Sequence, residues 1–184
     1  KLDFYSSWTP AALWARYLVD GRKEPAVALL PDLEKEYARW DGHKGIARPF
    51  PSQKGMEGLA AHKCPSAALY WQYDVRDAME ETISGGRKEK NERPSINSYM
   101  YGNARAIAAI ATLAGDMATA KIYNTKADTL KTLVENYLWN DRHNFFEVLK
   151  KDSFANVREA VGFIPWYFNL PSDNAKYAQA WRQC

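Results

Sequence analysis

The stretch SINSYMYGNARAIAAIATLAGDMATAKIYNTKADTLKTLVENYL, residues 95–138, decides the fold class of this chain. Ser95 is a suitable N-cap for a helix that runs to Ala114, or to one residue short of it. Gly115 then favours the left-handed backbone that ends a helix, and Asp116 can cap the next helix at once. Two long helices joined by so short a turn run antiparallel, so this stretch predicts an αα-hairpin.

The second helix of the pair carries a single apolar face. Its apolar residues recur three and four positions apart, as one face of an α-helix requires. They are Ala120, Tyr123, Ala127, Leu130, Val134 and Tyr137.

Further helices are expected before this hairpin. The pair Thr9-Pro10 is typical of an N-cap followed by proline at the first helical position, and Gly21 can end that helix. Residues 25–40 have apolar side chains three or four apart, although Pro31 should kink or divide that helix. The chain from there to about residue 65 is rich in Gly, Pro and Lys and predicts a long loop.

The residues after the hairpin alternate turns and short elements. Residues 140–144 predict a turn, and residues 145–149 predict a short extended segment. A loop containing residues 162–166 then leads to a last helix capped by Asp173. No series of strands alternates with the helices, so the pattern predicts an all-α protein. Helical hairpins separated by long loops are the plan of helical toroids.

Composition and charge exclude several classes of function. The chain has 184 residues, 46% hydrophobic and 26% charged, and no apolar run near the roughly 20 residues of a membrane span. The net charge is only +3, and the basic stretch 87–93 includes Glu89 and Glu92, which argues against a nucleic-acid groove. Cys64 and Cys184 have no zinc-binding spacing, so we expect no metal. Both ends of the sequence look cut.

Residues 70–85, YWQYDVRDAMEETISG, form the densest group of chemically capable side chains. Asp77 and Glu80 are three apart and would share a face of a helix. A general acid must stay protonated near neutral pH, and aromatic walls and nearby carboxylates both raise a carboxyl pKa. On spacing alone, a solvated helix start that carries acidic residues explains the segment as well.

The same segment resembles the acid motif of the clan that contains trehalase, mannosyl-oligosaccharide glucosidase and mannosylglycerate hydrolase. That motif is Glu-Ser-Gly-(Met/Trp)-Asp-x-Ser. Residues 76–82 match it at Met79 and place Glu80 where the catalytic Asp stands, whereas Arg76 replaces the first Glu. Three further motifs follow in the clan's order, and the match is closest to mannosylglycerate-hydrolase-like domains. They are Ser95-Ile96-Asn97-Ser98-Tyr99-Met100-Tyr101, then Leu138-Trp139-Asn140 with Phe145-Phe146-Glu147, then Gly162-Phe163-Ile164-Pro165-Trp166.

The resemblance implies an (α/α)6 toroid and a glycoside hydrolase of carbohydrate metabolism. Residues 1–184 would be part of the catalytic domain, truncated at both ends, with the general base beyond Cys184 in the remainder of the domain. Glu80, or alternatively Asp77, would be the general acid of an inverting reaction on an oligosaccharide or glycoside. The resemblance calls for no metal or organic cofactor. We favour a secreted or periplasmic location and expect neither membrane insertion nor nucleic-acid binding.

Seven residues are predicted to bind substrate: Trp71, Arg76, Asn97, Tyr99, Tyr101, Arg158 and Trp166. The aromatic rings suit sugar faces, although such rings more often belong to a core. Asn97 can bind sugar hydroxyls or serve as an extra helix cap, and Arg158 can line a pocket or pair on the surface. We expect Asp77, Glu80, Asn97, Arg158 and Trp166 to gather at one concave surface.

Two other functions remain compatible with the sequence. A non-catalytic carbohydrate-binding or scaffold protein would use the same helical frame without a functioning base. A helical-repeat interaction module would show a repeat of constant length. Neither alternative accounts for the order of polar motifs in the loops between the helices.

Overall fold

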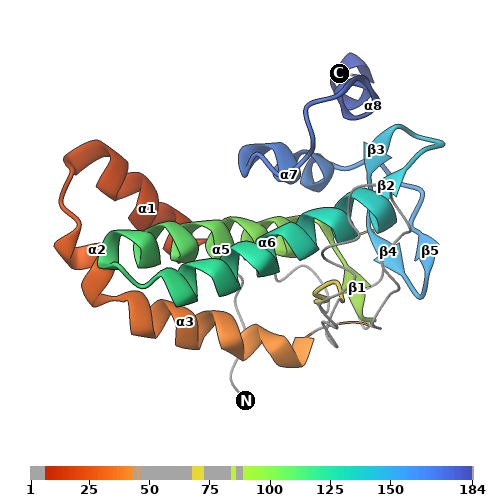
Figure 1. Ribbon diagram of the computed structural model, residues 1–184. Helices are drawn as coiled ribbons and strands as arrows, with labels where there is room; N and C mark the ends of the chain where they lie inside the picture. Colours follow the sequence, from red (N-terminus) through yellow and green to blue (C-terminus); the bar gives the residue numbers. More distant parts are fainter. Residues whose placement is uncertain (1–6, 44, 46–67, 73–83, 86–88, 184) are drawn as a thin grey trace.

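The computed structural model describes residues 7–43, 45, 68–72, 84–85 and 89–183, and the described part is mainly helical (Figure 1). The α-helices are α1 (Thr9–Asp20), α2 (Glu24–Ala28), α3 (Leu30–Arg39), α5 (Pro94–Ala114), α6 (Met117–Tyr137), α7 (Ile164–Tyr167) and α8 (Ala175–Ala178). The 3₁₀ turns are η1 (Trp40–His43), η2 (Ala160–Phe163) and η3 (Gln179–Gln183). The strands, each of two residues, are β1 (Asn91–Glu92), β2 (Trp139–Asn140), β3 (Phe145–Phe146), β4 (Leu149–Lys150) and β5 (Ser153–Phe154).

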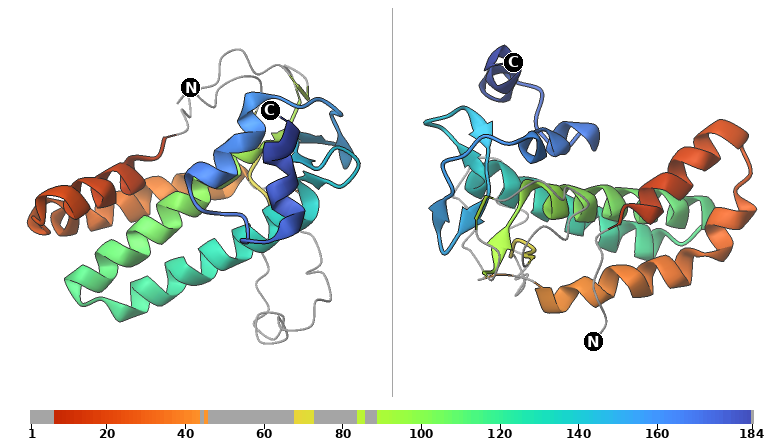
Figure 2. Two further views of the ribbon diagram at one scale, coloured as in Figure 1. Left: turned by 90° about the horizontal axis from the view of Figure 1, so that it is seen from above. Right: turned by 180° about the vertical axis from the view of Figure 1, so that it is seen from behind.

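The predicted αα-hairpin is confirmed as α5 and α6, which lie antiparallel and side by side (Figures 1 and 2). Gly115 has φ 79°, and its N–H and that of Asp116 donate to the last carbonyls of α5. The Asp116 side chain accepts from the Thr119 N–H at 3.0 Å, as the N-cap of α6. The hydrogen bond from the Thr119 N–H is the main cause that lowers the pKa of the Asp116 carboxyl. The turn therefore satisfies the groups that both helix ends leave open.

The start of α5 corrects one prediction. Ser95 is not the N-cap, because the helix begins at Pro94 and the N-cap is Arg93, whose backbone is extended. Proline at the first helical position has its φ already set for a helix and needs no N–H there. Ser95 is consequently fully buried inside the first turn.

The N-terminal helices follow the proline and glycine signals. Pro31 divides the second helical stretch as predicted, since α2 ends at Ala28 and α3 starts at Leu30. Gly21 ends α1 with φ 68°. The N-cap of α1 is Trp8 and not Thr9. Thr9 is the first helical residue and Pro10 the second, and proline fits the first turn because its N–H is not needed there.

The strands form two small antiparallel groups at the end of the hairpin where α5 starts and α6 ends (Figure 1). β2 pairs with β3 across the predicted 140–144 turn, and β4 pairs with β5 and with β1. The extended segment predicted for residues 145–149 is thus split between β3 and β4. The strand pairs therefore bring the loops between them to the end of α5 and α6 where α5 starts.

The C-terminal part departs from prediction in two places. Residues 162–166 were expected in a loop but lie in η2 and α7, with Pro165 in the first turn of α7. A Cβ added at Gly162 would overlap the Phe146 carbonyl, so close packing explains that glycine. The last helix is capped by Asn174, which accepts from the Tyr177 N–H at 3.2 Å, and not by the neighbouring Asp173.

Burial distinguishes an inner from an outer helix. Every residue from 94 to 104 in α5 is buried, including its polar ones, and α1, α3 and α6 all contact α5 (Figure 2). α6 buries one face, and the predicted apolar stripe is confirmed, with only Tyr137 half-buried. No helix in the described part of the chain is long and apolar enough to cross a membrane.

Candidate functional site

The acid candidates Asp77 and Glu80, together with Arg76, fall within residues 73–83, outside the described residues. The chain on either side of that segment is described, at residues 68–72 and 84–85. Both of these flanks contact the residues that lead into α5. The two flanks of the acid segment are therefore anchored beside the start of α5.

Asn97 fixes the first flank. Its Nδ2 donates to the carbonyl oxygens of Tyr70 and Arg93, each at 2.9 Å, and its Oδ1 accepts from the Tyr70 N–H at 2.7 Å. The side chain is 0% exposed. The Asn side-chain amide carries both donors and an acceptor, so it can bind the N–H and the C=O of one residue at once. The predicted contact between Asn97 and sugar hydroxyls is not supported by this geometry, since both its donors bind backbone.

Backbone and guanidinium contacts complete the anchoring. Gln72 and Asn91 exchange two backbone hydrogen bonds of 2.9 Å, three residues before α5. On the second flank, Arg93 donates from Nη2 to the Ser84 carbonyl at 3.0 Å and is only 1% exposed. The Ser84 hydroxyl donates in turn to the Glu159 carboxylate. The two ends of the acid segment thus meet the same short stretch, residues 91–97.

Three of the predicted stacking aromatics are buried in the described structure. Trp71 is 7% exposed, with the Lys90 ammonium 4.4 Å from its ring centroid. Tyr99 lies between Trp8 and Phe168, and Tyr101 is likewise buried. Such rings shape the walls around α5. In this arrangement they do not present an open face to a ligand.

Trp166 has a different environment. It is half-buried, with ring centroids 5.3 Å from Phe146 and 5.5 Å from Trp181. Phe146 also stacks on Tyr177 of α8. The aromatic cluster therefore attaches α7, α8 and η3 to the β2–β3 hairpin.

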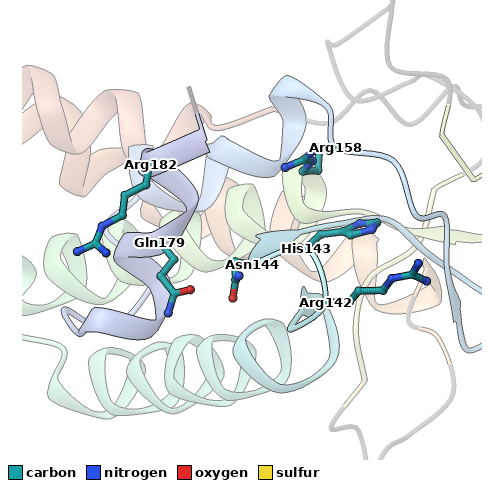
Figure 3. Close-up of a pocket in the computed structure, with 6 residues that line it drawn as sticks. All are labelled: Arg142, His143, Asn144, Arg158, Gln179 and Arg182. Atoms are coloured by element: carbon teal, nitrogen blue, oxygen red, sulfur yellow. The ribbon is translucent and has the colours of Figure 1, made fainter.

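A pocket of about 400 Å³ opens beside this cluster (Figure 3). Arg142, His143 and Asn144 come from the β2–β3 turn, and Gln179 and Arg182 come from η3 on the other side. Arg158 precedes η2 and is the one lining residue that the sequence analysis predicted. The others were missed because nothing local in the sequence links residues 142–144 with residues 179–182.

A buried carboxylate supports the pocket wall. Glu147 is 1% exposed and accepts from Asn140 Nδ2 at 3.0 Å, while its other oxygen contacts His143 Nδ1. Asn140 Oδ1 also accepts from the Arg142 N–H at 3.0 Å. These contacts hold the turn that presents Arg142 and His143. Glu147 belongs to the third motif noted in the sequence.

The expected gathering of site residues can be followed only in part. Glu159, which contacts Ser84 at the end of the acid segment, directly precedes η2 and follows Arg158 in the chain. The contact between Ser84 and Glu159 therefore links the end of the acid segment with the chain that lines the pocket. Trp166 lies in the aromatic cluster next to the pocket, and Asn97 is buried at the start of α5. Within the described residues, no group of three or more His, Cys, Asp or Glu is placed to hold a metal.

The inner and outer helices, with their polar loops at one end, define an all-α fragment of a six-hairpin glycosidase. Over residues 2–184 the chain belongs to the family of mannosylglycerate hydrolase MGH1-like glycoside hydrolase domains. The expected fold class and family are thereby confirmed.

Individual relatives are longer than this chain. A solved structure titled sialidase is 50% identical, with a TM-score of 0.82, over 97% of this chain and 15% of its own. The periplasmic trehalase of Escherichia coli is 33% identical over 40% of this chain and 14% of its own length. An uncharacterized protein of Borreliella burgdorferi is 22% identical over 90% of this chain and 31% of its own. The chain thus spans less than a third of each.

Proposed function

We propose that this chain forms part of the catalytic domain of a glycoside hydrolase and that it supplies the general acid. The observation that carries this proposal is the anchoring of both ends of the 73–83 segment on residues 91–97 at the start of the inner helix. A general acid must be held in place to protonate one oxygen, and this anchoring is suited to that task. Membership of a glycoside hydrolase family supports the same assignment.

Glu80 is the proposed acid, with Asp77 as the alternative. The acid gives its proton to the departing glycosidic oxygen as the bond to the anomeric carbon breaks. A carboxylate elsewhere in the complete protein removes a proton from the attacking water. The clan resemblance implies inversion, in which the two carboxyl groups stand roughly 6.5–9.5 Å apart to leave room for that water.

The substrate class follows from the same proposal. We infer an oligosaccharide or glycoside, bound together with the remainder of the domain. A periplasmic or secreted location is supported by the likeness to a periplasmic trehalase. A non-catalytic carbohydrate-binding protein on the same frame is the competing function.

The stereochemistry of the first product tests this mechanism. The complete protein should hydrolyse a glycoside and release a sugar whose anomeric configuration is opposite to that of the substrate. Proton NMR in the first minutes of reaction, before mutarotation, records the anomer directly. Release of the same anomer would contradict inversion. Absence of hydrolysis with all glycosides that bind would support the non-catalytic alternative.

A further inference from the structure

We propose that the pocket between the β2–β3 turn and η3 is a subsite for negatively charged sugars, so that the substrate is an acidic oligosaccharide. This inference rests on the proposed glycosidase function and adds the class of substrate. It begins with the charge of the lining residues. Among the residues that the structure describes, the pocket is lined by three arginines and by no carboxylate. The arginines are Arg142, Arg158 and Arg182.

Two of them, Arg142 and Arg182, differ from several other arginines of the described chain in their contacts. Arg16, Arg22, Arg39 and Arg105 each form an ion pair with an Asp or a Glu. In the part of the chain that the structure describes, the guanidinium groups of Arg142 and Arg182 form neither an ion pair nor a hydrogen bond. Both side chains are exposed. Both guanidinium groups are therefore available to bind an anion.

The remaining lining groups can also take part. Asn144 and Gln179 offer amide N–H donors, which bind either an anionic oxygen or a sugar hydroxyl. Guanidinium groups bind carboxylate and sulfate through two parallel hydrogen bonds. The wall therefore combines charged donors for an anion with neutral donors for the rest of a sugar.

The directions of the arginine side chains favour a chain over a single small anion. Figure 3 shows Arg142 and Arg182 on opposite sides of the pocket, with Asn144 between them and their guanidinium groups pointing away from each other. The pocket volume of about 400 Å³ lies in the range typical of small-molecule sites. An oligosaccharide that carries a negative group on successive units would reach more than one arginine.

The position of the pocket connects it with cleavage. The β2–β3 turn, which forms one wall of the pocket, lies at the end of the αα-hairpin where α5 begins (Figure 1). Arg158 is next to Glu159, which binds Ser84 at the end of the acid segment. A saccharide seated in the pocket can therefore extend toward Ser84, the first described residue after the acid segment. The pocket is then a binding subsite, and its arginines take no part in proton transfer.

Binding measurements on the complete protein test this inference. Three tetrasaccharides are compared by titration calorimetry: one of uronate units, one that carries sulfates on neutral sugars, and one uncharged. At least one acidic tetrasaccharide should bind about tenfold or more tightly than the uncharged one, and added salt should weaken that binding. The uronate and sulfate arms show which anion the pocket prefers. Equal affinity for all three would overturn the proposal.

A matched pair of double variants separates the pocket from general charge. Arg142→Gln with Arg182→Gln should abolish the preference for the acidic ligand. Lys23→Gln with Lys121→Gln removes the same charge from two exposed residues, one between α1 and α2 and one near the start of α6, and should preserve it. Equal losses in both double variants would contradict a specific subsite.

Hydrolysis is measured separately from binding. The glycosidase function and the acidic-sugar subsite can then be contradicted by different results. Hydrolysis of glycosides without any preference for acidic ones would overturn the subsite and leave the glycosidase. Selective binding through Arg142 and Arg182 without hydrolysis would leave the subsite and overturn the glycosidase.

Discussion

Glu80→Gln in the complete protein is expected to lower kcat on a natural glycoside by about 10²–10⁴-fold, the usual contribution of general acid catalysis. The amide keeps the shape of a carboxylic acid and most of its hydrogen bonds, but it has no proton to give to the leaving oxygen. KM should therefore change little. Steady-state kinetics of the variant and the parent, measured on the same substrate, give both quantities.

Asp77→Asn is the comparison that identifies the acid. Asp77 lies three residues before Glu80, and the same change of carboxylate to amide has there a smaller expected effect on kcat. If Asp77→Asn is inactive while Glu80→Gln retains activity, Asp77 is the acid. If both variants retain full activity, the acid does not come from this segment.

Asn97→Asp is expected to have the second largest effect, because it reverses hydrogen bonds in a fully buried site. The carboxylate can still accept from the Tyr70 N–H, but it cannot donate to the carbonyls of Tyr70 and Arg93. The Tyr70 carbonyl then loses this donor, and the Arg93 carbonyl keeps the longer bond of 3.4 Å from the Asn97 backbone N–H. We expect a cost of roughly 2–5 kcal/mol in the free energy of unfolding. The flank of the acid segment should loosen as well.

Hydrogen exchange and kinetics together test the role of Asn97. The Gln72 amide, which donates to the Asn91 carbonyl on the same flank, should exchange faster in Asn97→Asp, and kcat should fall at temperatures where the variant remains folded. Asn124→Asp is the matched control, since Asn124 is exposed and its Oδ1 accepts from Arg105, which a carboxylate does as well. An unchanged kcat in folded Asn97→Asp would contradict a positioning role. A loss of kcat in Asn97→Asp equal to the loss in Asn124→Asp would also contradict a positioning role for Asn97.

The helical frame could be predicted because its signals are local. Gly115 and Asp116 determine a turn within two residues, and the apolar stripe of α6 has the period of a helix. Pro31 likewise divides α2 from α3. Such signals depend on neighbouring residues alone, and the structure confirms them.

Predictions failed where packing between distant residues decides the conformation. Residues 162–166 contain glycine and proline and were expected in a loop, yet Phe145 and Phe146 pack against Gly162 and favour a helical turn. The same limit applies to single caps. Asp173 and Asn174 are both good caps, and the sequence does not show which of them reaches the Tyr177 N–H.

The candidate site was only partly predictable for the same reason. Asn97 was correctly placed at the start of the inner helix, but its partner Tyr70 is 27 residues away and has no sequence signature. Arg142 and Arg182 are 40 positions apart, and their common pocket arises from the aromatic cluster of Phe146, Trp166 and Trp181. Contacts of this range follow from the tertiary structure.

The most direct measurement of the central claim is the activity of Glu80→Gln on a glycosyl fluoride. Fluoride leaves with little protonation, so a variant that lacks only the acid should cleave the fluoride at a rate near that of the parent. The same variant should remain about 10²–10⁴-fold slower on the natural glycoside. An equal loss on both substrates would show that Glu80 does not donate the proton and would contradict its assignment as the general acid.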